Sequence, residues 1–283
     1  MFSLHFFTFF NVVHFFFFVH VYEIIYKYLC KIGSKILIVT GSPFDDGINM
    51  EIVDVEDSSF TCQFEAFPVR LYGATGGLIN GLPFLCGGYY DEAPYYSNDC
   101  YKMTGAGSWT KDETASLNTG RMFAGTGSVV IENQLILSGG FGEPGLLNSI
   151  EMVSPDTAAS TPSVELPTGF QGHCLVKWDE STVMVIGGSF EETQAETLLI
   201  DVVSNTWSAG PILTTGRSYH ACGEIEIMGT PYIVVSGGVF IDEYRISTEI
   251  LEKDNVENGW QTSKHRKLFL TTCLLDISLY FRN

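Results

Sequence analysis

Four arginines at nearly constant spacing are the first side chains in this sequence that could bind a ligand. The positions in the series are Arg70, Arg121, Phe170, Arg217 and Arg266, so a phenylalanine interrupts it. A guanidinium group binds a carboxylate through two parallel hydrogen bonds. Arranged around one opening, the arginines would bind carboxylates of a partner. The alternative is that each arginine bonds to loop carbonyls or neighbouring acids, which is a structural role.

Four tyrosines lie in one short segment. They are Tyr89 and Tyr90, followed after four residues by Tyr95 and Tyr96. Tyrosine supplies rigid, amphipathic contact area at low entropic cost. We therefore predict that this segment is a recognition loop and that its tyrosines contact a partner.

Catalytic chemistry has little support in the sequence. His173 and His220 lie near Cys174 and Cys222, but a metal site needs three or four converging ligands. No nucleophile-elbow or zinc-protease motif occurs. We predict no catalytic residue, no metal and no cofactor, and we expect the two histidines to have a structural role.

The element that must position these residues is a glycine doublet that follows a short apolar run and recurs four times, at intervals of 52, 48 and 50 residues. A period near 50 indicates one supersecondary unit repeated in space. Glycine allows positive φ and close backbone approach, which suits a sharp turn at the end of a strand. The doublets are Gly87-Gly88, Gly139-Gly140, Gly187-Gly188 and Gly237-Gly238.

Each unit contains short β-branched runs separated by turn residues, a pattern typical of four short strands. A lone four-stranded sheet cannot bury both faces, whereas sheets packed face to face around an axis can. We therefore predict an all-β propeller. Three tryptophans follow the doublets and are expected to pack between blades: Trp109, Trp207 and Trp260.

These features together resemble the Kelch repeat family. The marks are the doublet after an apolar strand, an acidic residue eleven positions later (Asp99, Glu151 and Glu249), the tryptophan, and the arginine before the next strand. The resemblance covers about Ile36 to the C-terminus and implies a Kelch-type propeller. It also implies that the arginines contact acidic peptide motifs, as in Kelch domains that recruit partners. No BTB or F-box region is visible.

The number of blades is open. Four units are complete, and residues 35–53 look like a worn copy that lacks its first strand. Residues 268–275 could supply that strand and close a five-bladed ring. The alternative is a fragment of a six-bladed protein.

Charge and cysteine content constrain the partners and the location. Outside the first 35 residues the net charge is −20, which repels nucleic acid and anionic membranes. The seven cysteines are odd in number and show no C-x-x-C spacing, so neither a disulfide framework nor a zinc site is indicated. The absence of any Asn-x-Ser/Thr sequon also favours an intracellular setting. We therefore predict an intracellular, cytoplasmic protein.

Residues 1–35 form a separate Phe-rich segment, and the propeller is assigned to 36–283. Residues 1–22 are long and apolar enough to span a bilayer as a helix, which would tether the propeller on the cytosolic side. The alternative is translated non-coding sequence joined to a truncated gene.

The expected function is a non-catalytic protein-interaction module that presents loops and an arginine-lined channel mouth to a protein with an acidic or mixed-charge motif. The alternative is a propeller enzyme, such as a galactose-oxidase-like copper oxidase or a sugar isomerase.

Overall fold

The computed structural model describes residues 65–262, apart from 105–107, 126–128, 160–163, 191 and 241–242, and five short backbone stretches before them. Their regular secondary structure is β-strand apart from one short 3-10 helix, η1 (Lys253–Asn258). The prediction of an all-β fold is confirmed.

Five antiparallel sheets follow one another along the chain, and the strands of each pair in chain order. The first sheet contains β3 (Tyr28–Ile32), β4 (Lys35–Val39), β5 (Asn49–Asp54) and β6 (Glu65–Ala66). The second contains β7 (Thr75–Ile79), β8 (Leu82–Cys86), β9 (Asp99–Met103) and β10 (Trp109–Ser116). The third contains β11 (Val130–Ile131), β12 (Gln134–Ser138) and β15 (Ile150–Val153). The fourth contains β16 (Cys174–Lys177), β17 (Thr182–Ile186), β18 (Thr197–Asp201) and β19 (Thr206–Ala209). The fifth contains β20 (Ala221–Ile227), β21 (Thr230–Ser236), β24 (Thr248–Glu252) and β25 (Gln261–Thr262).

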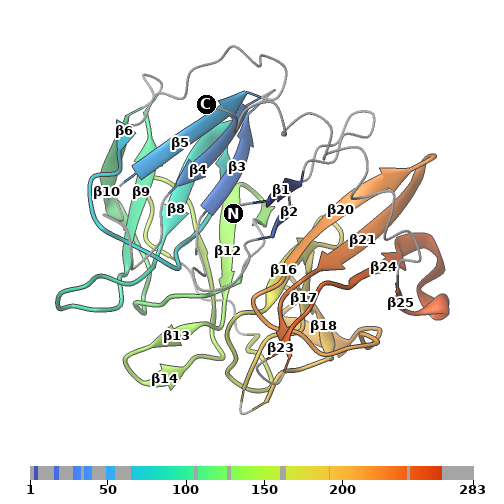
Figure 1. The fold of residues 1–283 in the computed structure, drawn as a ribbon. Helices are drawn as coiled ribbons and strands as arrows, with labels where there is room; N and C mark the ends of the chain where they lie inside the picture. The colour runs from blue at the N-terminus through green and yellow to red at the C-terminus, as the bar shows by residue number, and fades with distance from the viewer. Residues whose placement is uncertain are drawn as a thin grey trace.

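Three two-stranded hairpins accompany the sheets: β1 (Ser3–His5) with β2 (Phe16–Phe18), β13 (Phe141–Gly142) with β14 (Gly145–Leu146), and β22 (Val239–Phe240) with β23 (Glu243–Tyr244). The hairpin β1–β2 lies between β3 and β20, and β2 contacts β20 (Figure 1). Among the described residues no helix is long and apolar enough to cross a membrane.

The first sheet corrects the expectation that the N-terminal copy lacks its first strand. β3 pairs with β4 from Tyr28 opposite Val39 to Ile32 opposite Lys35. This sheet is therefore complete without a strand from the C-terminal end. Residues 268–275, expected to close the ring, lie outside the described residues, as does Arg266.

The sheets pack face to face in chain order, from blue to orange in Figure 1. Along β12, Leu135 and Leu137 pack in one core with the second sheet, whereas Ile136 packs in another core with the fourth. In β17, Val185 joins the core shared with the third sheet and Ile186 the core shared with the fifth. Alternate side chains point to opposite faces of a strand, so burying both faces requires an unbroken apolar run. This stacking of small sheets is the β-propeller architecture.

The tryptophans follow the prediction in two of three cases. Trp109 is 7% exposed and packs in the core beside Phe67, and Trp260 is 5% exposed and donates its indole N–H to the Pro211 carbonyl at 2.8 Å. The expectation for Trp207 was wrong. It is 48% exposed, and its strand, β19, buries none of its side chains.

The glycine doublets join consecutive sheets. All eight doublet glycines have positive φ, between 56° and 106°. The second glycine of a doublet donates its N–H to a carbonyl at the start of the next sheet: Gly88 to Arg121 at 2.7 Å, Gly140 to Phe170 at 3.0 Å and Gly188 to Arg217 at 2.9 Å. A Cβ on Gly140 would lie 2.5 Å from the Met122 carbonyl oxygen. Positive φ and close approach, the two properties expected of the doublet, are both confirmed.

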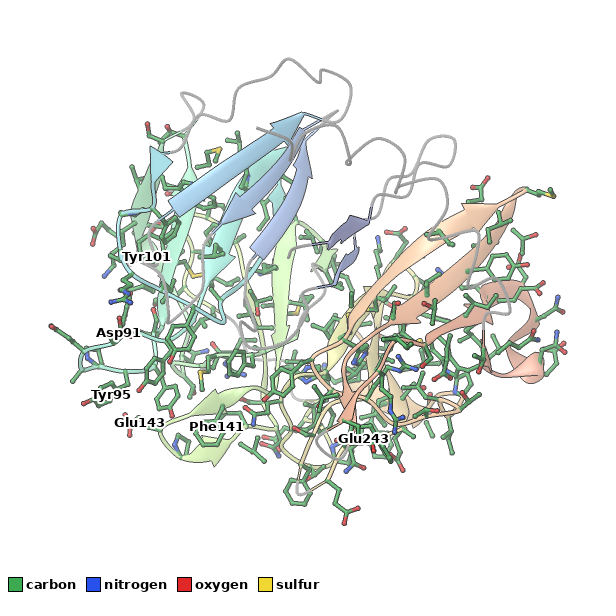
Figure 2. All side chains as sticks on the ribbon, viewed as in Figure 1. Asp91, Tyr95, Tyr101, Phe141, Glu143 and Glu243 are labelled. Atoms are coloured by element: carbon green, nitrogen blue, oxygen red, sulfur yellow. A yellow bond between two sulfur atoms is a disulfide. The ribbon has the colours of Figure 1, made fainter. Side chains whose placement is uncertain are left out.

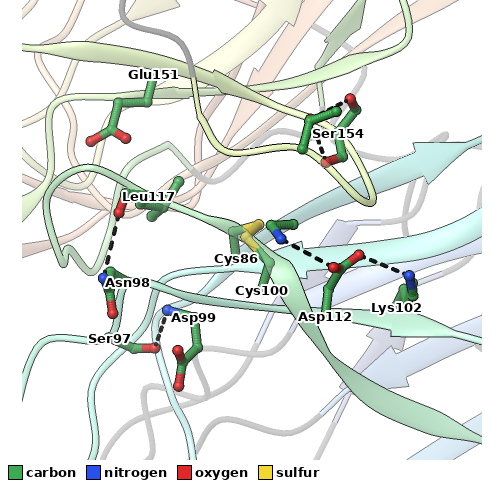
Figure 3. The surroundings of a disulfide bond; sticks show 12 residues. Cys86, Ser97, Asn98, Asp99, Cys100, Lys102, Asp112, Leu117, Glu151 and Ser154 are labelled. Carbon is green, nitrogen blue, oxygen red and sulfur yellow. Dashed lines mark hydrogen bonds and ion pairs between the residues drawn. A yellow bond between two sulfur atoms is a disulfide. The ribbon is translucent and has the colours of Figure 1, made fainter.

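Two disulfides correct the expectation of free cysteines. Cys86 and Cys100 are directly opposite each other on β8 and β9 and are bonded (Figure 3). Cys174 and Cys222 join the first strands of the fourth and fifth sheets across 48 residues of chain. Disulfides persist in oxidising compartments, so the cysteines no longer support an intracellular location, which stays a prediction.

Replacing Gly140 by alanine tests the close backbone approach at the doublet. We expect Gly140→Ala to lower the free energy of unfolding by at least about 3 kcal/mol, because strain at positive φ costs about 1–2 kcal/mol and the backbone clash adds to it. Gly145→Ala is the matched control, since Gly145 has a similar φ of 100° but nothing within 4 Å of its Cβ position. Equal losses in urea titrations of the two variants would contradict a contribution of the close approach to stability.

Candidate functional site

The arginine positions can be aligned from the structure through four bridges, one in each of the second to fifth sheets. Tyr72 pairs with Tyr89, Met122 with Phe141, Gln171 with Ser189, and Ser218 with Val239. The residues that precede the first member of each bridge are therefore equivalent. They are Leu71, Arg121, Phe170 and Arg217.

Arg121 and Arg217 are buried ion-pair partners inside their sheets. Arg121 donates to the carbonyl oxygens of Gly139 at 2.9 Å and Ser149 at 3.0 Å, and it is paired with Glu151. The side chains of the pair are 0% and 1% exposed. The Glu151 carboxylate also accepts the N–H groups of Asn118 and Thr119. The ion pair thus fixes the segment that leads into the third sheet.

The fifth sheet repeats the arrangement. Arg217 donates to Gly237 at 2.8 Å and Ser247 at 3.1 Å, and it is paired with Glu249 at 2.6 Å. Glu249 accepts the Thr214 N–H at 2.7 Å. The third and fifth sheets therefore contain the same buried arginine–glutamate pair at equivalent positions.

In the second and fourth sheets apolar side chains occupy the same positions. Glu151 is opposite Leu137 in its sheet, as Tyr101 is opposite Leu85 and Leu198 is opposite Val185. Leu71 and Tyr101 share one buried core, and Phe170 and Leu198 share another. Ionic and apolar pairs thus alternate from the second to the fifth sheet.

The hypothesis of an arginine-lined mouth is corrected by this geometry. Arg121 and Arg217 are buried among acceptors of their own sheets, and Arg266 lies outside the described residues. Arg70 stands one residue before the equivalent position, so its side chain points outward and pairs with Asp91 at 3.0 Å. A shift of one residue in a strand reverses the direction of the side chain. The structural role left open by the sequence is the one observed.

The equivalence of the ionic and apolar pairs can be tested by replacing the ionic pair of the third sheet with the apolar pair of the fourth. We expect Arg121→Phe and Glu151→Leu each to lose about 3–5 kcal/mol of unfolding free energy, because each leaves a buried charge unpaired. The double variant should lose at least about 1 kcal/mol less than the sum of the two, since the fourth sheet packs Phe170 and Leu198 at these positions. Chemical denaturation of the wild type, the two single variants and the double variant measures the coupling between residues 121 and 151. Strictly additive losses would contradict the equivalence of the ionic and apolar pairs.

The predicted recognition loop, residues 89–98, is held by one of its tyrosines. The Tyr90 hydroxyl donates to Asp99 at 2.9 Å, lies 3.1 Å from the Tyr101 hydroxyl and accepts from Ser97 at 3.1 Å. Its backbone N–H donates to the Tyr95 carbonyl at 2.7 Å. Tyr90 is therefore an internal anchor of the loop, which corrects its assignment as a partner-binding residue.

The other three tyrosines form a surface with two aromatic residues that the prediction missed. The ring of Tyr89 is stacked on Tyr95 at 5.8 Å and meets Tyr96 edge to face at 5.3 Å. Tyr72 lies 5.1 Å from Tyr89, and Phe141 lies 5.8 Å from Tyr96. We call these five residues the tyrosine surface. All five are partly exposed, and Tyr95 is 44% exposed.

Main-chain hydrogen bonds hold the tyrosine surface in place. Tyr72 and Tyr89 exchange N–H donors at 3.2 and 2.8 Å, and the Phe141 N–H donates to Met122 at 2.9 Å. The Tyr96 carbonyl passes so close to Gly120 that a Cβ there would lie 2.3 Å from its oxygen. The rings are therefore presented by paired backbone at the junction of the second and third sheets.

Negative charge borders the tyrosine surface. Figure 2 shows Asp91, Tyr95, Phe141 and Glu143 on the same side of the molecule. Burial, and then the nearby Tyr89, Asp91 and Tyr96, raise the pKa of Tyr72. Burial, Tyr89 and Glu143 raise the pKa of Tyr96 in the same way. An open cleft of about 440 Å³ adjoins the loop and is lined by Val69, Arg70, Tyr90, Asp91, Glu92 and Ala93.

The two histidines are buried rather than arranged around a metal. His173 Nε2 lies 2.7 Å from the Ser138 hydroxyl, and both histidines are enclosed at the start of the fourth and fifth sheets. Burial lowers the pKa of each to about 3, with the Arg217 charge contributing at His220. Within the described part of the chain, no three His, Cys, Asp or Glu side chains are grouped as a metal site would require.

Because these two histidines are buried, we expect the folded protein to be less stable at acidic pH. Their pKa is lower in the folded chain than the ordinary 6.5, so the unfolded chain binds more protons below pH 6.5. Stability should therefore fall as the pH drops from 6.5 towards 3, by up to about 1.4 kcal/mol per pH unit for each histidine. Urea titrations between pH 7 and 4 should show a shallower decline for His173→Gln/His220→Gln than for the wild type. Parallel declines in the two proteins would contradict the lowered pKa of these histidines.

Two further aromatic residues at the joints between sheets were not predicted from the sequence. Phe123 and Tyr219 have φ of 56° and 52°, which is unusual for bulky residues. Each ring covers a glycine of the preceding sheet, Gly73 and Gly172 respectively, and the two rings lie 5.7 Å apart. Both residues stand two positions after the arginine site, so a correct repeat alignment would have grouped them.

The site therefore belongs to a β-propeller whose inter-sheet joints support an aromatic loop surface. No protein-family model matches the chain. An 80-residue part is 36% identical to "Spermatocyte protein spe-26" of Caenorhabditis elegans, covering 28% of this chain and 13% of that protein. The match thus spans about an eighth of that relative's length. The solved structure of YjhT superposes with a TM-score of 0.68 at 14% identity, covering 85% of this chain and 84% of that one. This likeness shows the propeller fold.

Proposed function

We propose that this chain is a non-catalytic protein-interaction module, a Kelch-type repeat propeller that binds a partner protein through the tyrosine surface. The repeat marks that resemble the Kelch family support the class of module. They include the doublets, the tryptophans and, in two sheets, the arginine paired with its glutamate. The arginines take no part in the proposed contact.

The observation that carries the proposal is the combination of exposure and order at the tyrosine surface. Tyr89, Tyr95 and Tyr96 sit on a loop whose backbone is bonded at both ends and whose base is fixed by Tyr90. Aromatic side chains that are already held in place lose little entropy on binding, and they dominate the energetics of many interfaces. Rings held in this way are suited to anchoring a partner segment.

The alternative of a propeller enzyme lacks a supporting arrangement among the described residues. A stoichiometric transition metal in the purified protein would revive it.

An unbiased peptide-display selection tests the proposal. Peptides selected on the wild-type protein should bind Tyr89→Ala/Tyr95→Ala at least about tenfold more weakly, the loss expected when interface anchors are truncated. Phe190→Ala is the matched control. Phe190 is 45% exposed, and it lies in the corresponding loop of the fourth sheet.

The selected peptides should bind the Phe190→Ala variant as well as they bind the wild type, and all variants should keep the wild-type melting temperature. Failure to enrich any peptide would contradict the proposal. Peptides that bind regardless of the tyrosine substitutions would contradict it equally.

A further inference from the structure

We infer that the tyrosine surface binds a cationic side chain, an arginine or lysine of an extended segment in the partner protein. The inference rests on the proposed function and specifies the chemistry of the partner. Its basis is a comparison between equivalent loops of this chain.

The hairpin of the fifth sheet already contains the complete arrangement. The Arg245 guanidinium lies over the Phe240 ring, 4.8 Å from its centroid, and 3.7 Å from the Glu243 carboxylate. A guanidinium over an aromatic face is attracted by the electron density of the ring. This hairpin therefore combines an aromatic face, a carboxylate and a cation in one loop.

The loops of the second and third sheets contain the same parts except the cation. The Arg245 N–H donates to the second doublet glycine, Gly238, and the residues that make this bond in the other two loops are Ser97 and Leu147. Neither loop, 89–98 or 141–147, has a lysine or arginine anywhere in its sequence. Both have aromatic rings, and both have carboxylates.

The charge around the tyrosine surface fits a cation brought by a partner. Asp91, Glu92 and Glu143 are all exposed there. Two described cations lie beside the loop. Lys111 is paired with Asp99 at the base of the loop at 2.8 Å. Arg70 binds Asp91 at 3.0 Å, with both side chains more than 40% exposed. This pair shows that the edge of the surface accepts a guanidinium. The chain as a whole carries a net charge of −18, which would also draw a basic segment towards it.

The exposed ring of Tyr95 is the best placed to receive the cation. Tyr95 is 44% exposed, and Tyr89 stacks beneath it with an interplanar angle of 18°. Figure 2 shows Tyr95 between Asp91 and Glu143. Beyond burial and the nearby Tyr89, Asp91 raises the pKa of Tyr72 and Glu143 raises the pKa of Tyr96, so both carboxylates act on rings that contact Tyr89, the partner of Tyr95.

Synthetic peptides provide the test. The probe is a short Gly/Ser peptide with two arginines, compared with the same peptide carrying citrulline or glutamate at those positions, by fluorescence anisotropy. We expect the citrulline peptide to bind about tenfold more weakly and the glutamate peptide more weakly still. Tyr95→Phe should keep affinity within about twofold, because the ring face is unchanged, whereas Tyr95→Ala should lose about tenfold.

The charge variants separate a specific site from general attraction to an acidic protein. Asp91→Asn/Glu143→Gln should weaken the arginine peptide about five- to tenfold, and Glu243→Gln, the matched control in the fifth sheet, should leave it unchanged. Equal losses from all of these substitutions would overturn the inference, as would equal binding of the three peptides. If display selection yields tyrosine-dependent peptides without arginine or lysine, the inference fails while the proposed function stands.

Discussion

The hydrogen bond from the second glycine of each doublet to the next sheet is the contact on which the rest of the structure depends. It is made three times in the described chain, and its acceptor is always the carbonyl of the arginine position. Because the donor ends one inner strand and the acceptor precedes another, the bond fixes the distance between neighbouring sheets. A Cβ on the first glycine of a doublet would meet the carbonyl at the arginine position of the next sheet, and a Cβ on the second would meet the segment that leads into its own sheet, which is why glycine recurs every fifty residues. The apolar cores between sheets can then form at constant separation.

Around this fixed joint, the side chain at the arginine position is free to vary. Arg121 and Arg217 bring a glutamate partner into the core, whereas Leu71 and Phe170 meet apolar partners. Buried ion pairs and apolar pairs of similar volume can be nearly equivalent in free energy, so both fill the same space. The loop after each doublet varies even more between sheets, in both length and sequence. In the second sheet it is two residues longer than in the third and carries the tyrosines. The proposed binding surface thus lies on a segment that the joint supports but does not constrain.

Much of the fold could be predicted from the sequence because glycine spacing and apolar runs report directly on backbone geometry. The side-chain assignments depended on register, and a shift of one residue was enough to place Arg70 at a position that Leu71 occupies. Asp99 was matched to Glu151 for a related reason, since the longer tyrosine loop moves the equivalent position to Tyr101. The disulfides could not be predicted, because Cys86 and Cys100 meet only through strand pairing and Cys174 and Cys222 only through sheet packing. Tyr72 and Phe141 were missed because they reach the tyrosine surface from outside the loop.

Amide hydrogen exchange at the doublets tests the central role of the joint most directly. The N–H groups of Gly88, Gly140 and Gly188 should exchange as slowly as the inner strands of their sheets, so that they are released only when the whole propeller unfolds. The N–H groups of the exposed loop residues Asp91 and Glu92 should exchange much faster. If the doublet amides exchange at the rate of these loop residues while the strands remain protected, the joint does not hold the sheets together.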